Sequence, residues 1–98
     1  MQVIRHPKLA ADIRDITVHY ADVSEGVLSE FWTELDLILT SIERNPRSHH
    51  FDASGLRRAN FQRFPYHLLY QVDEENIFLV VLRHDRRKPS FGLGRRMQ

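Results

Sequence analysis

The stretch from Gly55 to Pro89 constrains the fold more than any other part of the chain. It contains three apolar or alternating segments, which run from Leu56 to Phe64, from Tyr66 to Val72 and from Ile77 to Leu82. Segments of this kind, separated by short polar connections, predict a three-stranded antiparallel meander. We therefore expect a small antiparallel sheet, and the preceding residues should cover one of its faces.

The side-chain pattern of these segments predicts that the sheet has one polar face and one core face. Successive residues of a strand point to opposite faces, so Arg58 and Asn60 should lie opposite Ala59 and Phe61. The segment from Ile77 to Leu82 is apolar without interruption, which is typical of a strand that is covered on both sides. We expect this strand to be the best-buried strand of the sheet.

Two amphipathic helices are predicted before the sheet. Pro7 suits the first turn of a helix, and apolar residues recur at helical spacing from Leu9 to Tyr20. A second apolar stripe runs from Leu28 to Ile42, with Ser24 as its N-cap and Asn45-Pro46 as its end. The two helices should therefore form an antiparallel hairpin.

The two ends of the chain have different predicted structures. The β-branched pair inside Gln2 to Arg5 favours a short strand that pairs with the sheet. The segment from residue 89 to residue 98 contains two glycines and no apolar run, so we expect a flexible tail. A chain of 98 residues has the length of one domain, and we expect residues 1–98 to form a single domain.

Composition narrows the chemistry that this chain can perform. With 42% hydrophobic and 28% charged residues, the chain has the composition of a globular protein. It has no cysteine, which removes disulfides, thiolate catalysis and zinc–thiolate sites and suits a cytoplasmic protein. No apolar run is long enough for a signal peptide or a membrane span. His49-His50 lacks further ligands nearby, so we expect no metal and no cofactor.

Charge is distributed unevenly along the chain. Residues 1–50 hold five Lys/Arg and eight Asp/Glu, whereas residues 51–98 hold nine and five, so the two halves carry about −3 and +4. The cations of the second half lie on the predicted sheet and on the tail. A cationic face attracts polyanionic or acidic partners over long distances, and we expect a partner of that kind.

Four stretches, in their order and spacing, resemble the RelE/ParE superfamily of bacterial type II toxin–antitoxin toxins. They are Ile42–Pro46, Gly55–Arg58, Arg63–Val72 and Val81–Pro89. The resemblance covers nearly the whole chain. It implies an α+β fold of order β-α-α-β-β-β, in which the helical hairpin packs on one face of the antiparallel sheet while the other face and the tail are functional. It also implies a cytoplasmic, growth-inhibiting toxin that a small cognate antitoxin neutralises, with no small-molecule cofactor.

The superfamily contains two activities, and the first is cleavage of ribosome-bound mRNA by RelE-like members. Such cleavage needs a proton acceptor, cations for the developing charge and an acid for the leaving oxygen. The resemblance implies these catalytic residues here: Arg58, Arg63, His67, Arg83 and His84. This chain departs from that pattern, because His67 stands where RelE-like sequences usually carry an arginine and no tyrosine follows Arg87. These departures weaken the ribonuclease interpretation.

The second activity is inhibition of DNA gyrase by ParE-like members, which tend to have a longer helical hairpin and a histidine followed by basic residues after the last strand. The long stripe from Leu28 to Ile42 fits that branch, and we favour it. The implied target-binding residues are Arg83, His84, Arg86, Arg87 and Lys88. Two further hypotheses stay open: an inactive family member that acts only as a binding subunit, and an unrelated nucleic-acid-binding α+β domain.

Overall fold

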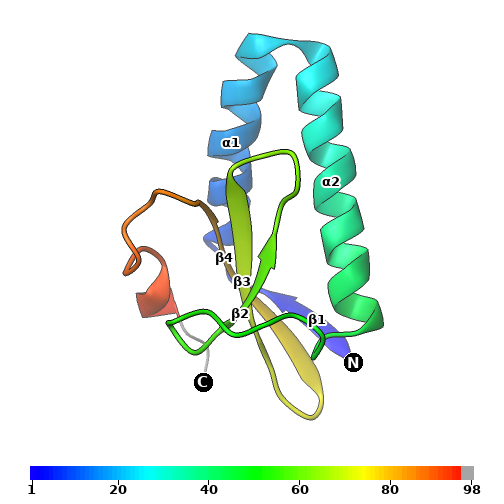
Figure 1. Cartoon of the computed structure of the whole chain (residues 1–98), viewed down its shortest axis with the longest axis vertical. Helices are drawn as coiled ribbons and strands as arrows, with labels where there is room; N and C mark the ends of the chain where they lie inside the picture. The colour runs from blue at the N-terminus through cyan, green and yellow to red at the C-terminus, as the bar shows by residue number, and fades with distance from the viewer. Residues whose placement is uncertain (96–98) are drawn as a thin grey trace.

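The computed structural model describes residues 1–95 and has the predicted order of elements (Figure 1). These are β1 (Gln2–Arg5), α1 (Leu9–Val23), α2 (Glu25–Arg44), β2 (Arg57–Asn60), β3 (Tyr66–Val72), β4 (Asn76–His84) and a 3-10 turn, η1 (Leu93–Arg95). The predicted α+β class, the helical hairpin and the antiparallel meander are confirmed. Figure 1 shows α1 and α2 side by side as an antiparallel pair.

The four strands form one sheet in the order β1-β4-β3-β2. As predicted, β4 lies inside the sheet, and its residues from Leu79 to Leu82 are at most 2% exposed. β1 pairs with β4 in parallel, from Gln2 opposite Asn76 to Arg5 opposite Leu79. The sheet is therefore mixed, whereas the sequence predicted an antiparallel one. The difference arises because β1 is joined to the meander through two helices, so no tight turn sets its direction.

One face of the sheet, the inner face, packs on the helical hairpin. The centre of this core is Phe31 of α2, which is fully buried and stacks on Phe61 with ring centroids 5.3 Å apart. Tyr20 of α1 meets Phe64 edge to face at 5.0 Å. Each such aromatic pair contributes about 0.5–1.5 kcal/mol beyond the apolar area that it buries. The aromatic residues therefore fix both helices to the meander.

A single residue joins the two helices. The apolar spacing of the first helix reached Tyr20, whereas α1 continues to Val23, and α2 begins at Glu25. Ser24 between them has extended backbone angles, and its hydroxyl accepts a hydrogen bond from the Val27 N–H at 3.1 Å. The predicted N-cap is confirmed, and α2 ends at Arg44 with Asn45 as its C-cap.

We predict that Ser24→Ala lowers the free energy of unfolding by about 1 kcal/mol, because the Val27 N–H loses its acceptor. Ser24→Gly should cost only a few tenths of a kcal/mol, since glycine is tolerated at N-caps. Urea denaturation of the three proteins measures the difference. Equal losses for alanine and glycine would contradict a capping role.

The opposite face of the sheet, the outer face, carries a second apolar cluster of Leu56, Leu69, Val80 and Val81. A β-bulge creates part of it. Leu69 lies opposite Val81 but Tyr70 lies opposite Leu79, so Val80 is an extra residue in β4. Because a bulge disturbs the alternation of side chains, Val80 and Val81 both contribute to the same face. The outer face is therefore partly apolar, although the sequence predicted a polar one.

Residues 89–95, which we name the strap, cover this cluster. The strap belongs to the segment that we expected to be a flexible tail, yet Phe91 and Leu93 pack on the outer-face cluster. Figure 1 shows the strap, in orange and red, to the left of the strands in this view. The rest of that predicted tail, residues 96–98, lies outside the described residues. Among residues 1–95, neither helix has both the length and the apolar character needed to cross a membrane.

Candidate functional site

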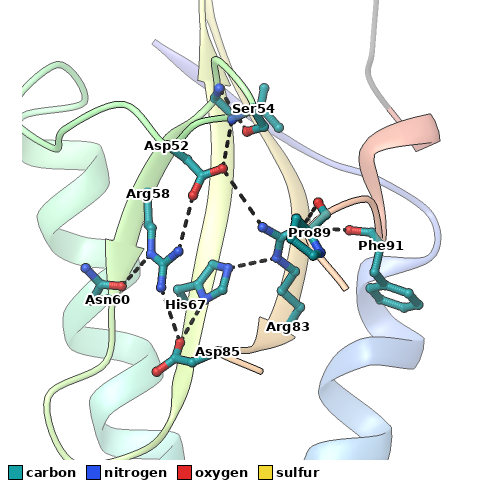
Figure 2. A network of polar contacts seen from close by, with 10 residues as sticks. Asp52, Ser54, Arg58, Asn60, His67, Arg83, Asp85, Pro89 and Phe91 are labelled. Carbon is teal, nitrogen blue, oxygen red and sulfur yellow. Dashed lines mark hydrogen bonds and ion pairs between the residues drawn. The ribbon is translucent and has the colours of Figure 1, made fainter. Parts of the chain in front are cut away.

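The strand register brings three of the predicted site residues, Arg58, His67 and Arg83, together on the outer face. Asn60 of β2 lies opposite His67 of β3, and His67 lies opposite Arg83 of β4. Arg58 lies one row further along, opposite Leu69. Side chains that face each other across a sheet are about 4.5–5.5 Å apart at Cβ. The polar residues of three strands can therefore form one network, which Figure 2 shows.

His67 is at the centre of this network and is only 1% exposed. Its Nε2 accepts a hydrogen bond from Arg83 Nε at 2.8 Å. Its Nδ1 lies 2.8 Å from an Asp85 carboxylate oxygen. Arginine has only donors and an ionised carboxylate has only acceptors, so the proton of the ring is on Nδ1. His67 is therefore a neutral ring with both nitrogens bonded inside the protein.

Arg83 joins the network to the strap. One terminal nitrogen of its guanidinium donates to the backbone carbonyls of Pro89, at 2.6 Å, and Phe91, at 3.0 Å. The other terminal nitrogen is 3.9 Å from an Asp52 carboxylate oxygen. The side chain is 4% exposed. A planar guanidinium can bond in several directions at once, and here every nitrogen of Arg83 has a partner within the chain (Figure 2).

Arg58 connects the two carboxylates. It lies 3.2 Å from Asp52 and 3.5 Å from Asp85, and its Nε donates to Asn60 at 2.7 Å. Its side chain is 32% exposed, so it remains partly in contact with solvent. Two arginines and two carboxylates thus balance one another around the neutral His67.

The surroundings shift the pKa values of these groups. Burial lowers the pKa of His67, and the charges of Arg58 and Arg83 lower it further, although the hydrogen bond to Asp85 acts in the opposite direction. Burial opposes ionisation of Asp52, but hydrogen bonds from Ser54 and Arg58 outweigh it and lower the pKa of Asp52. At neutral pH the ring is therefore neutral while the Asp52 carboxylate is ionised.

A second set of contacts holds the strap to α1. Arg95 of η1 forms a two-pronged ion pair with Asp12, with nitrogen–oxygen distances of 2.6 and 3.0 Å. Asp12 also accepts a hydrogen bond from the Leu82 N–H at 3.2 Å. Leu82 lies beyond the residues of β4 that pair with β1, so this edge of β4 is open to α1. The guanidiniums of Arg87 and Arg95 lie over the Phe91 ring, at 4.1 and 5.3 Å from its centre. The strap is thus attached at both of its ends.

The other predicted residues lie apart from the network. Arg63 is in the connection between β2 and β3, where its exposed side chain pairs with Glu30 of α2 at 3.3 Å. His84 is half-buried, stands edge to face with Tyr66, and accepts a hydrogen bond from the Arg86 N–H at 3.0 Å. The predicted catalytic residues therefore do not converge on one open cleft. Within residues 1–95, no three His, Asp or Glu side chains are close enough together to hold a metal ion.

The predicted target-binding residues divide into two groups. Arg83 is buried in the network, whereas Arg86, Arg87 and Lys88 are exposed on the turn after β4. The side chains of Arg86 and Lys88 form no ion pair with any residue of 1–95. We name residues 86–88 the basic turn. Of the predicted target-binding cations, these three are the ones that are exposed to a partner.

The sequence did not indicate Asp52, Asp85 or Asp12 as parts of this region. Asp52 is in the loop before β2 and Asp12 is in α1, and both are far in sequence from the residues of β4 that they contact. The only local signal was at Asp85, which follows a histidine at the end of the last strand. Carboxylates near a predicted cluster of arginines are the groups expected to neutralise it, but loop geometry decides which ones reach it.

Comparison with known proteins identifies the family. Residues 3–89 match the family described as "ParE toxin of type II toxin-antitoxin system, parDE". The chain belongs to this ParE toxin family. The predicted resemblance, including its ParE-like branch, is confirmed. A comparison with curated proteins found no match.

The ParE fold is also found in a solved structure. A chain described as "Chromosomal ParDE TA system from P. aeruginosa" superposes on this ParE-family chain with a TM-score of 0.69 and 18% sequence identity. The match covers 86% of this chain and 95% of that chain. At this identity the likeness concerns the fold, which agrees with the arrangement of hairpin and sheet described above.

Proposed function

We propose that this ParE-family chain is a growth-inhibiting toxin that acts by binding DNA gyrase rather than by cleaving RNA. The observation that carries the proposal is the state of His67 and Arg83, which are buried and bonded to each other at 2.8 Å. A general base must reach the proton that it abstracts, and a cation that stabilises a phosphate must face it. The predicted target-binding cations that are exposed stand instead on the basic turn, where they suit a binding surface.

The neutralising partner in this proposal is a small cognate antitoxin. A groove of about 450 Å³ lies between α1 and α2 beside the end of β1. Its apolar lining includes Leu9, Ile13 and Leu39, together with Trp32, which is 43% exposed. Arg5 and Asp36 supply charges at the same groove. An amphipathic segment of the antitoxin can place its apolar side in such a groove.

Two assays run in parallel test the activity. Purified protein is added to gyrase-catalysed supercoiling of a relaxed plasmid and to mRNA on translating ribosomes. We expect inhibition of supercoiling and intact mRNA. Cleavage of the mRNA with normal supercoiling would contradict the proposal and favour the ribonuclease activity. Expression of the chain alone should arrest growth. If a small gene next to the gene of this chain encodes the antitoxin, co-expression of that gene should restore growth.

A charge-reversal variant tests the basic turn. We predict that Arg86→Glu/Lys88→Glu weakens gyrase inhibition about 100-fold, because like charges placed opposite each other cost several kcal/mol. Both side chains are exposed, so the free energy of unfolding should change by less than about 0.5 kcal/mol. Arg83 and Arg87 are left unchanged because they contact the strap.

The matched control is Arg14→Glu/Arg44→Glu, which makes the same charge change on exposed positions of the helices. It should retain inhibition within about threefold, since distant surface charges are largely screened at physiological salt. Equal loss in both double variants would mean that net charge, and not the basic turn, determines binding.

A further inference from the structure

The end of the strap next to the basic turn is bonded to one side chain of the sheet. Arg83 donates to the carbonyls of Pro89 and Phe91, the first and third residues of the strap. The basic turn lies between Arg83 and the strap in the chain, so it is bounded on one side by β4 and on the other by these bonds. The orientation of the Arg83 guanidinium therefore fixes the point at which the chain leaves the basic turn for the strap.

His67 sets that orientation. Its Nε2 accepts from Arg83 Nε, and its Nδ1–H donates to Asp85. Only the neutral ring with its proton on Nδ1 can make both bonds. A second proton would place an N–H group on Nε2 against the Arg83 N–H, and the two nitrogens are buried and only 2.8 Å apart.

The charged groups around His67 do not compensate for such a proton. Arg83 of β4, Asp85 directly after β4 and Arg58 of β2 surround the ring, and Asp52 in the loop before β2 pairs with both arginines. These two arginines and two carboxylates sum to zero formal charge. The strap faces the network with backbone carbonyls, while its Arg95 is engaged with Asp12. A protonated ring would therefore give this buried site one uncompensated positive charge.

We propose that His67 and Arg83 are positioning residues that hold the strap, and with it the basic turn, only while His67 is neutral. Protonation of His67 turns an acceptor into a donor, so the guanidinium must move away and the strap carbonyls lose their bonds. The proposal depends on the proposed function in one respect only, namely that the basic turn binds the target. The docking of the strap can be tested without any target.

The direction of the pH dependence follows from the shift at His67. Burial lowers the pKa of His67 in the folded chain, so the ring binds a proton more readily once the strap has released it. Docking is then fully favoured above the ordinary pKa of histidine, about 6.5, and is lost as the pH falls below that value. Each pH unit in that range changes the docking equilibrium by up to about tenfold.

Hydrogen–deuterium exchange of the full chain measures docking directly. In the docked strap, the N–H groups of Phe91, Leu93 and Arg95 donate to the carbonyls of Lys88, Ser90 and Gly92. We expect their protection, corrected for the intrinsic effect of pH on exchange, to fall about tenfold between about pH 7.5 and pH 5.5. Fragments from the helical hairpin should keep their protection. Unchanged protection of the strap would overturn the proposal.

Two histidine variants locate the proton. His67→Gln retains an acceptor for Arg83 and a donor for Asp85 but does not titrate, so its strap should stay protected at the lower pH. His84→Gln is the matched control, because His84 is the neighbouring histidine and bonds to the Arg86 N–H; its strap should respond as the unmodified protein does. A pH response that persists in His67→Gln, or disappears in His84→Gln, would overturn the assignment.

A measurement on the unmodified chain covers the case in which His67→Gln does not fold. The ¹⁵N chemical shifts of the His67 ring should show the Nδ1–H tautomer at about pH 7.5. On acidification, the ring should titrate with the same midpoint as the loss of strap protection. A different midpoint would overturn the proposal. Because neither experiment contains gyrase, failure here is distinguishable from failure of the proposed function.

Discussion

Replacing Arg83 by methionine is expected to lower the free energy of unfolding by about 3–5 kcal/mol, the usual cost of removing one partner from a buried ion-pair network. The side chain is 4% exposed, so solvent screens its contacts weakly. Methionine fills a similar volume but leaves His67, Asp52 and the two strap carbonyls without their donor. Urea denaturation followed by circular dichroism measures the loss.

Two further variants identify the cause of that loss. Arg83→Lys keeps the charge, but its single nitrogen cannot replace the three nitrogens of the planar guanidinium that reach His67, Asp52 and the strap. It should therefore recover little of the stability. Arg86→Met changes an exposed arginine only three positions away and should stay within about 0.5 kcal/mol of the unmodified protein. A loss below about 1 kcal/mol for Arg83→Met would mean that Arg83 does not hold the strap.

Gly92→Ala is expected to detach the strap. Gly92 has a φ of +82°, and an added Cβ would stand 2.6 Å from Val81 Cγ2 and 2.8 Å from Val81 Cβ. The strained backbone costs about 1–3 kcal/mol, and the steric overlap adds a cost of similar size. The chain can relieve both by releasing the strap. We expect exchange protection at Phe91 and Leu93 to be lost while the helical hairpin keeps its own.

Gly94→Ala is the matched control for this variant. A Cβ at Gly94 would have no neighbouring atom within 4 Å, and its position is two residues away in the same strap. This variant should keep strap protection, and its free energy of unfolding should change by less than about 0.5 kcal/mol. Equal effects of the two alanines would indicate that the strap is sensitive to any substitution, and not to its contact with Val81.

The outer face of the sheet differs from the open cationic surface that we expected. Neither α1 nor α2 covers it, which agrees with the prediction that the helical hairpin packs on one side only. Its arginines, however, are used inside the chain: Arg83 by His67 and the strap, and Arg58 by two carboxylates. The predicted cations that are exposed to an acidic partner lie instead on the basic turn. Residues 86–88 are therefore the part of this region that is most accessible to a target.

The candidate site could be predicted in part. Alternation along the strands correctly placed Arg58 and Asn60 on the face opposite Ala59 and Phe61, because the period of two in a strand is a local property. Burial of His67 and Arg83 could not be predicted in this way. It results from the strap folding back over β3 and β4 and from Asp52 arriving from a loop, and both depend on contacts between residues distant in sequence.

The sequence by itself determined the elements of this protein and the side chains that each element presents. Helical spacing, the Ser24 cap and the Asn45-Pro46 end defined the hairpin, and the apolar run from Ile77 to Leu82 defined the buried strand. Tertiary structure alone decided the parallel pairing of β1, the extra residue at Val80, and the closure of the strap onto the sheet. Local patterns indicate the secondary structure that a segment favours and the face on which each residue lies. The three tertiary features arise only when segments distant in sequence meet and compete for the same face or edge of the sheet.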